Sequence, residues 1–353
     1  TFRYYRFAGR TSRFDLSMAL ARGNDESKYA PMTAGAWKRG DNRMQRLIEV
    51  GGEFPPAPGR YTLFVNYGCG WSHQVMMMRS LKGLHECVGL VHVGYHRIGK
   101  SGTDSYRGWA VPDDPTGNGF RTAYDVYNSN QDYGTMQMTI PILFDLVLKR
   151  VVSNDPAQIL IMLNSCFDEW AVASLDMYPE EMQASIEEVN DVVYPGINDG
   201  VYRCWFASSD EGYDEGFSGL QRALAWIENR LQHAPYLCGE RLTLADIRAF
   251  PHLFRFDCIY HGLMLREPRG PFLSEQSPAT TTWLERIFAD PVVAQTCDMT
   301  LATVMYCHLS NEEAVRQYTE RKLPWMPTAE ELEAKRVGEG LPAQISYPAA
   351  STL

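Results

Sequence analysis

The sequence lacks the features that mark a membrane-spanning or nucleic-acid-binding protein. No apolar run approaches the roughly 18 residues that a membrane-spanning helix requires; the run at 158–163 is short and flanked by polar residues. Acidic residues outnumber basic ones by 43 to 33, which gives a net charge of -10, and the basic residues form no stripe. Because nucleic-acid affinity depends on clustered Lys and Arg, we expect neither a nucleic-acid partner nor a transmembrane segment.

Paired cysteines are also missing. The eight cysteines form no C-x-x-C pair and are scattered through the chain, unlike a disulfide framework or a structural zinc site. We therefore expect a soluble protein in a reducing intracellular compartment. We expect this compartment to be the cytoplasm. Because the numbering begins at Thr1 without a methionine, an organelle stroma or matrix, reached with a transit peptide that is then removed, is the other expectation. The cysteines are Cys69, Cys87, Cys166, Cys204, Cys238, Cys258, Cys297 and Cys307.

The length and composition predict two domains between flanking arms. The 353 residues, 45% of them hydrophobic, are enough for two cores that need no disulfide or metal. The polar, proline-terminated start predicts an extended arm, and the proline-containing end predicts a tail. The expected divisions are an N-terminal arm at 1–59, a first domain at 60–170, a second domain at 175–322 and a tail at 323–353.

The first domain has the element order of the thioredoxin fold. Aromatic and β-branched runs predict strands, and a helical period separates the first two. The expected elements are strands at 61–66, 88–93, 138–144 and 149–153, a helix at about 71–84, and a helix that begins near Asp155. Pro141 enters the third strand, where this fold places a cis peptide bond; most X-Pro bonds are trans, so only the surrounding pattern favours cis.

The second domain is predicted to be all helical. Two apolar stripes recur at i, i+3, i+4 and i+7 spacing: Met182, Ile186, Val189 and Val193 in one helix, and Phe217, Leu220, Leu224, Ile227 and Leu231 in another. Thr243 and Asp246 form a capping-box pattern ahead of a third apolar run. Asp246 is therefore predicted to be structural and not catalytic.

Cys69 is the candidate for chemistry, because it lies where a predicted strand runs into a helix. The free amides and the dipole of a helix start favour thiolate over thiol. A buried, inert cysteine is the alternative reading. Cys69 and His73 are four residues apart and could share a metal, but no second pair of ligands accompanies them, so we predict no metal site.

A series of motifs in order resembles one class of glutathione transferases, the Xi class or glutathionyl-hydroquinone reductases, over about residues 60–310. The motifs are Tyr67-x-Cys69-x-Trp71-x-His73, Leu81-Lys82-Gly83-Leu84, Gly108-Trp109, Thr139-Ile140-Pro141-Ile142-Leu143, Val152-Ser153-Asn154, Asn164 with Phe167-Asp168-Glu169, Tyr194-Pro195, Asn198-Asp199-Gly200-Val201-Tyr202-Arg203, Ala245-Asp246-Ile247-Arg248, and Arg255-Phe256-Asp257 with Tyr260. The resemblance implies a thioredoxin-like domain followed by the all-helical domain of a glutathione transferase.

The resemblance also implies an activity and a set of site residues. Cys69 matches the nucleophile, which attacks a glutathionyl-hydroquinone, forms a mixed disulfide and is released by a second glutathione. Glutathione is then the co-substrate and a small aromatic molecule the substrate. The implied glutathione-binding residues are Trp109, Gln137, Ile140, Pro141 and Asp155, and the implied aromatic pocket holds Tyr194, Tyr260 and Tyr306.

Three positions depart from the family pattern. Gly70 stands where the family has proline, Gln137 where it has arginine, and Asp155-Pro156 where it has Glu-Ser. Proline supplies neither the hydroxyl nor the backbone N–H of serine to a glutathione carboxylate. A homodimeric enzyme is the leading interpretation, and a catalytically silent structural subunit of a larger assembly is the alternative.

Overall fold

The computed structural model describes residues 33–40, 44–96, 108–129, 138–172, 175–266 and 270–308. The chain divides into two compact units, Thr1–Pro31 and Met32–Leu353, and the described residues all belong to the second. The predicted tail at 323–353 lies outside them, and the predicted domain boundaries remain predictions. Among the described helices, none has the length and apolar character needed to cross a membrane.

The first half of the described chain is built on a four-stranded sheet in the order β2-β1-β5-β6. β1 pairs parallel with β2 and antiparallel with β5, which in turn pairs antiparallel with β6. All five residues of β1 are buried, as expected for a central strand covered on both faces. The strands are β1 (Tyr61–Val65), β2 (Val88–His92), β5 (Ile142–Asp145) and β6 (Arg150–Ser153).

Three helices and a small second sheet complete the described part of this half. α2 (Gly70–Leu81) follows β1, and α4 (Pro156–Ser165) begins after its N-cap Asp155, as predicted. The smaller sheet pairs β3 (Gly94–His96) with β4 (Gly108–Ala110), and α3 (Ala123–Asn128) precedes β5. The arrangement confirms the predicted thioredoxin-like fold.

The entry into the third strand differs in one detail from the prediction. The Ile140–Pro141 peptide bond is cis, as expected. However, β5 begins at Ile142 and not at residue 138. Proline has no N–H to give to a neighbouring strand, so regular pairing starts only after it.

The second half is helical, which confirms the predicted fold class. The apolar stripes of its two longest predicted helices are buried at Ile186, Val189 and Val193 and at Leu220, Leu224, Ile227 and Leu231, whereas Met182 and Phe217 are half-buried. Its elements are η2 (Glu180–Met182), α5 (Gln183–Val193), η3 (Tyr194–Asn198), α6 (Gly200–Phe206), α7 (Asp210–Leu231), α8 (Leu244–Phe254), η4 (Phe256–Tyr260), α9 (His261–Leu263), α10 (Leu273–Gln276), α11 (Pro278–Phe288), α12 (Pro291–Ala294) and α13 (Met299–His308).

Asp246 is structural, as its sequence position predicts. Its carboxylate is completely buried and accepts hydrogen bonds from the backbone N–H groups of Thr243 and Leu237 and from Trp283 Nε1, each at 2.9 Å. The Thr243–Asp246 capping box is present at the start of α8. A buried carboxylate with three such donors stabilises the helix start and the packing of α11 on α8.

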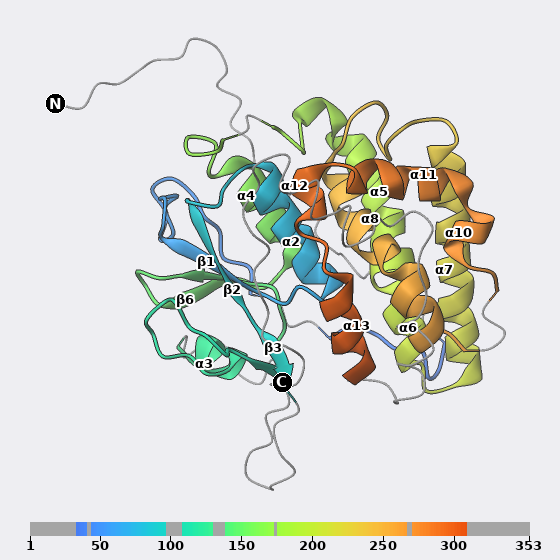
Figure 1. Ribbon diagram of the computed structural model, residues 1–353, viewed down its shortest axis with the longest axis horizontal. Helices are drawn as coiled ribbons and strands as arrows, with labels where there is room; N and C mark the ends of the chain where they lie inside the picture. Colours follow the sequence, from blue (N-terminus) through green and yellow to red (C-terminus); the bar gives the residue numbers. More distant parts are fainter. Residues whose placement is uncertain are drawn as a thin grey trace, which may run out of the picture. The chain divides into compact units, whose positions relative to one another are not determined.

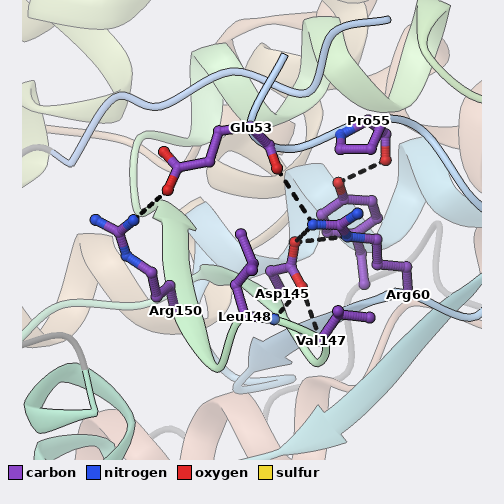
Figure 2. Close-up of polar contacts among 8 residues, drawn as sticks. Glu53, Pro55, Arg60, Asp145, Val147, Leu148 and Arg150 are labelled. Atoms are coloured by element: carbon purple, nitrogen blue, oxygen red, sulfur yellow. Dashed lines mark hydrogen bonds and ion pairs between the residues drawn. The ribbon is translucent and has the colours of Figure 1, made fainter. Parts of the chain in front are cut away.

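An ion-paired cluster stabilises the beginning of β1 and the β5–β6 turn (Figure 2). Asp145 is completely buried and lies 2.6 Å from Arg60 Nη2 and 2.7 Å from Arg60 Nε. The same carboxylate accepts the backbone N–H groups of Val147 and Leu148 at 2.8 and 2.9 Å. Glu53 pairs with Arg150 nearby, so the cations in this cluster have carboxylate partners.

α2 connects the two halves of the described chain. It lies between the sheet and the helices of the second half (Figure 1) and contacts α4, α8 and α12. Met76, Met77 and Met78 are buried in this region, where flexible thioethers fit an irregular contact surface. The start of α2, and with it Cys69, therefore lies where residues from both halves meet.

Candidate active site

Cys69 is the N-cap residue of α2 and is 6% exposed. Its side chain makes no capping hydrogen bond, so the first-turn amides are not occupied by it. The loop before it is fixed by Asn66, whose side-chain oxygen accepts the Gly68 N–H at 2.8 Å and whose Nδ2 donates to Val93 O at 2.6 Å. The strand-loop-helix geometry thus places Cys69 at the N-terminus of α2, next to first-turn amides that its own side chain does not cap.

Gly68 allows α13 to approach this loop closely. A Cβ at Gly68 would lie 3.0 Å from Ala302 Cα and 3.0 Å from Met305 Cβ. Because Ala302 Cα is backbone, it cannot move aside as a side chain could. The glycine therefore brings α13, which carries Tyr306, against the residues that precede Cys69.

Three tyrosine hydroxyls form a cluster close to Cys69. Tyr306 Oη lies 2.8 Å from Tyr202 Oη and 3.4 Å from Tyr260 Oη. The structure thus brings two of the predicted pocket tyrosines, Tyr260 and Tyr306, together. Tyr202, in the helix α6, was not predicted as a site residue, although the family motif at 198–203 contains it and was the one signal that pointed to it.

Burial keeps these phenols protonated. Burial raises the pKa of Tyr260 to about 12 and raises the pKa values of Tyr202 and Tyr306 well above the usual value for tyrosine. The charge of Cys69 contributes in the same direction to the pKa of all three, which places them in the electrostatic environment of the sulfur. At neutral pH the cluster therefore presents neutral O–H groups that can donate to an oxygen of a ligand.

Tyr194 lies beside Trp71, the second residue of α2. Its ring meets Trp71 edge to face at 5.9 Å, and Arg248 lies 5.9 Å from the ring centroid. Arg39 approaches Trp71 as well, 5.0 Å from its centroid, and forms an ion pair with Asp199 at 2.7 Å. Tyr194 thus supports the tryptophan that follows Gly70, while its predicted contact with substrate remains a prediction.

His252 presents a fixed N–H beside the start of α2. Asn198 Nδ2 donates to Arg248 O at 2.9 Å, which can only accept, so the same amide nitrogen must also donate to His252 Nδ1 at 3.0 Å. His252 Nε2 therefore carries the proton. Burial, together with Arg255, Arg39 and Arg248, holds the His252 pKa well below its usual value, and the imidazole is neutral.

Gly70 provides the space that this imidazole occupies. A Cβ at Gly70 would lie 3.0 Å from Tyr260 Oη and 3.1 Å from His252 Nε2. Within the described residues, His252 Nε2 and Trp71 Nε1 are buried without a hydrogen-bond acceptor, and so is Arg39 Nη2. Asn198 Oδ1, beside His252, is a buried acceptor in the same condition, so three donors stand against one acceptor among these four atoms, which suits a ligand that carries oxygen or negative charge.

The residues predicted to bind glutathione differ in burial and in the hydrogen bonds that they already make. Ile140 precedes the cis proline and is 6% exposed, and no hydrogen bond of its backbone falls within the described residues, so its N–H and C=O are suited to an extended peptide ligand. Trp109 is half-buried in β4. Asp155 caps α4 through Ala157 N at 3.0 Å and also accepts from Gln45 Nε2 at 2.9 Å. Gln137 lies outside the described residues.

His73 contacts an arginine and a threonine. His73 Nδ1 lies 2.8 Å from Arg255 Nη1, and Nε2 lies 2.8 Å from Thr296 Oγ1. In the part of the chain that the structure describes, no group of three or more His, Cys, Asp or Glu side chains could hold a metal ion. Because Arg255 and Thr296 occupy its two ring nitrogens, His73 is a structural contact of the protein interior.

Comparison with known proteins places these features in a family. Residues 210–286 match the family described as Glutathione S-transferase, C-terminal domain. Glutathionyl-hydroquinone reductase PcpF of Sphingobium chlorophenolicum is 40% identical over 230 residues, which is 65% of this chain and 72% of that protein. Glutathionyl-hydroquinone reductase YqjG of Escherichia coli is 36% identical over 211 residues; the match spans 59% of this chain and 63% of that protein, just under two thirds.

Solved structures agree with these relatives. The glutathione S-transferase Xi of Phanerochaete chrysosporium has a TM-score of 0.73 at 28% identity, over 82% of this chain and 99% of that one. The glutathione-bound structure of YqjG from Escherichia coli has a TM-score of 0.70 at 27% identity, over 84% of this chain and 96% of that one. This chain therefore belongs to the glutathionyl-hydroquinone reductase family, the Xi class of glutathione transferases.

Proposed function

We propose that this protein is a glutathione-dependent reductase that removes glutathione from glutathionyl-hydroquinones through Cys69. The observation that carries the proposal is the position of Cys69, an uncapped cysteine at the start of α2 beside three protonated tyrosine hydroxyls. The names of the curated relatives and the glutathione-bound structure of a relative support the same activity.

The reaction has two steps: reductive cleavage of the thioether by Cys69, and then a thiol–disulfide exchange with a second glutathione. The Cys69 thiolate attacks the sulfur of the thioether, and an S–S bond forms as the bond between sulfur and the aromatic carbon breaks. The electron pair goes to the ring, which takes up a proton and leaves as the hydroquinone. A second glutathione thiolate then attacks the glutathionyl sulfur of the mixed disulfide, which yields glutathione disulfide and regenerates the Cys69 thiolate.

The hydroxyl cluster has a role in the first step. Negative charge develops on the ring and its oxygens as the carbon–sulfur bond breaks. Tyr202, Tyr260 and Tyr306 stay protonated because burial raises their pKa values. The two hydrogen bonds within the cluster use two of the three O–H protons, which leaves one hydroxyl of the cluster to donate to a ring oxygen. Donors that strengthen as charge develops stabilise the transition state more than the bound substrate.

The chain offers different support for the two ends of glutathione. The Ile140 backbone suits antiparallel pairing with the cysteinyl part of the tripeptide. At the start of α4 the Asp155 carboxylate suits the positively charged α-amino group, whereas Pro156 lacks the N–H that would bind the α-carboxylate. We therefore propose that this protein binds glutathione mainly through its cysteinyl portion and its amino group.

Mass spectrometry of the protein with a glutathionyl-hydroquinone tests the proposal. We expect hydroquinone release, glutathione disulfide formation and one glutathionyl group on Cys69 when no second glutathione is present. Cys69→Ser should abolish all three, while Cys166→Ser should keep them, because Cys166 is a half-buried thiol whose pKa burial raises to about 11. Wild-type protein that forms no adduct and releases no hydroquinone would refute the activity and favour the structural-subunit alternative.

The assembly is a separate part of the proposal. We propose a homodimer, for which light scattering after size-exclusion chromatography is the direct measurement. A single species at twice the chain mass of 40.1 kDa is expected. Co-purification with unrelated subunits, in the absence of turnover, would instead support a scaffolding role.

A further inference from the structure

Arg255 contacts the residues on both sides of Cys69. It lies at the end of α8 and is completely buried. Its Nε donates to Gly68 O at 2.9 Å and its Nη2 donates to Tyr67 O at 2.9 Å. These are the carbonyls of the two residues immediately before Cys69, so one guanidinium from the second half of the chain fixes the loop that carries the sulfur.

The same guanidinium also reaches the first turn of α2. Arg255 Nη1 lies 2.8 Å from His73 Nδ1 and 2.8 Å from Pro251 O. Arginine can only donate, so His73 Nδ1 accepts and His73 Nε2 carries the proton that it donates to Thr296 Oγ1. Burial, followed by Arg255 and His252, holds the His73 pKa well below its usual value, which keeps this ring neutral. The backbone N–H of His73 in turn donates to Cys69 O at 2.9 Å.

The charge of Arg255 is not matched by the groups that bind it. Its hydrogen-bond acceptors are three backbone carbonyls and a neutral imidazole. The carboxylate nearest in sequence, Asp257, accepts the N–H groups of Leu273 and Ser274 at 2.6 and 2.9 Å. A buried cation with neutral partners is costly, and an anion close by would lower that cost.

We propose that Arg255 is the positioning residue for Cys69: it fixes the loop before the sulfur and provides the positive charge that favours the thiolate. The inference rests on the proposed role of Cys69 as nucleophile. Arg255 binds the two carbonyls that precede Cys69, and through His73, whose backbone N–H donates to Cys69 O, it is linked to the first turn of α2. None of its four hydrogen-bond acceptors described above is an anion, so a thiolate at Cys69 would provide negative charge close to this buried cation. Tyr67, His73 and Arg255 belong to family motifs that the proposed reaction does not explain. In this proposal all three help to hold the loop and the helix start around Cys69.

The other groups around Cys69 keep a constant charge between pH 6 and 9.5. Tyr202, Tyr260 and Tyr306 remain neutral because their pKa values are raised, and His73 and His252 remain neutral because theirs are lowered. Arg39 stays positive, and burial raises the pKa of Cys297 to about 12. A pH-dependent reaction of Cys69 over this range therefore reports on its own thiol.

Alkylation of Cys69 by iodoacetamide, followed by mass spectrometry at several pH values, tests the proposal without any turnover. In Arg255→Gln we expect the rate at pH 6.5 to fall about tenfold and to approach the wild-type rate at pH 9.5, because lost thiolate is restored by base. Arg255→Lys retains the positive charge but loses the planar guanidinium that binds several acceptors at once. Its rate of Cys69 alkylation should therefore follow the wild-type pH profile within about twofold, while its melting temperature falls.

A matched control separates this role from general destabilisation. Arg60→Gln removes an arginine that is paired with Asp145 at the other end of β1, and it should lower the melting temperature but leave the alkylation profile unchanged. If Arg255→Gln loses stability and keeps the wild-type alkylation profile, Arg255 is only a structural contact and the proposal is wrong.

A second measurement needs no Arg255 variant, in case Arg255→Gln does not fold. A thiolate stabilised in the folded state adds stability as the pH rises toward about 8.5, the value for a free cysteine. The melting temperature of wild type relative to Cys69→Ser should therefore increase by about 2 °C from pH 6 to 9. A constant difference would overturn the proposal. Normal alkylation without hydroquinone release would instead contradict only the proposed enzymatic function.

Discussion

The arginines at the two ends of β1 differ in the charge of their partners. Before Tyr61, Arg60 lies against the buried carboxylate of Asp145, and Arg150 pairs with Glu53 (Figure 2). After Val65, the chain reaches Cys69, where the hydrogen-bond acceptors of the buried Arg255 within the described residues are three carbonyls and a neutral imidazole. Removing one partner of a buried ion pair is strongly destabilising, so the pairs at the first end serve the fold, whereas a cation bound by neutral acceptors at the other end can still interact with a thiolate or an anionic ligand.

Asp145→Ala should produce the largest loss of stability. The substitution leaves Arg60 without its carboxylate and removes the acceptor for the N–H groups of Val147 and Leu148. We expect a loss of about 3 kcal/mol in the free energy of unfolding, measured by urea titration. Alkylation of Cys69 in the folded variant should match wild type; a changed rate would show that the two ends of β1 are coupled.

Tyr306→Phe should damage the catalytic end and spare the fold. It removes the hydroxyl that lies between those of Tyr202 and Tyr260, so the cluster loses its central hydrogen bonds. We expect kcat/KM for a glutathionyl-hydroquinone to fall by about tenfold or more, the effect of one hydrogen bond to a developing charge. Tyr213→Phe is the control, because Tyr213 Oη accepts the Arg266 N–H in a region that does not include the cluster. Equal losses in both variants would contradict the role of the cluster.

Mild acid should weaken the protein through the two buried histidines near Cys69. Their folded-state pKa values lie well below the usual 6.5, so below about pH 6.5 the unfolded chain binds more protons and stability falls as the pH decreases. Each histidine should contribute a loss of about 1 kcal/mol between pH 7.5 and 5.5. Urea unfolding of wild type and of His252→Gln measures this difference, and an unchanged pH dependence in the variant would contradict the assignment.

Gly70→Ala should cause a smaller effect that depends on His252. The added Cβ would lie 3.0 to 3.1 Å from Tyr260 Oη and the His252 ring, both completely buried. We expect a loss of about 1 kcal/mol, recovered largely in the double variant with His252→Ala, where the ring no longer occupies that space. Thermal unfolding of the four proteins of this cycle gives the coupling energy. Additive effects would show that the backbone conformation at residue 70, and not the contact of a Cβ with the His252 ring, is the reason for glycine at this position.

Glu53→Gln should have the smallest effect. Its partner Arg150 and Glu53 itself are partly exposed, with side-chain exposures of 31% and 55%, so solvent screens the pair. We expect a change below about 0.5 kcal/mol in the free energy of unfolding. A loss as large as that of Asp145→Ala would mean that exposed and buried pairs contribute alike at this end of β1.

Local features of the fold were predictable from the sequence, whereas many of the contacts at the site were not. The Thr243–Asp246 cap and the helix start near Asp155 were predicted because the signals for both act within four residues of the helix start. The predicted start of β5 at residue 138 was wrong, because Pro141 has no N–H to donate to a neighbouring strand and regular pairing begins only at Ile142. The hydroxyl pair of Tyr202 and Tyr306 spans 104 positions, so no periodicity could indicate it.

Although β3, β4 and α3 were not predicted, the sequence by itself indicated the four strands of the larger sheet, the two helices α2 and α4, the apolar stripes of α5 and α7, the fold class and the cysteine at the start of α2. These follow from local backbone geometry, apolar periodicity and capping, which act over a few residues. Tertiary structure alone decided the surroundings of Cys69. Arg255 and His73, 182 positions apart, meet because α8 packs on α2, and that packing depends on the whole buried core and not on any local signal.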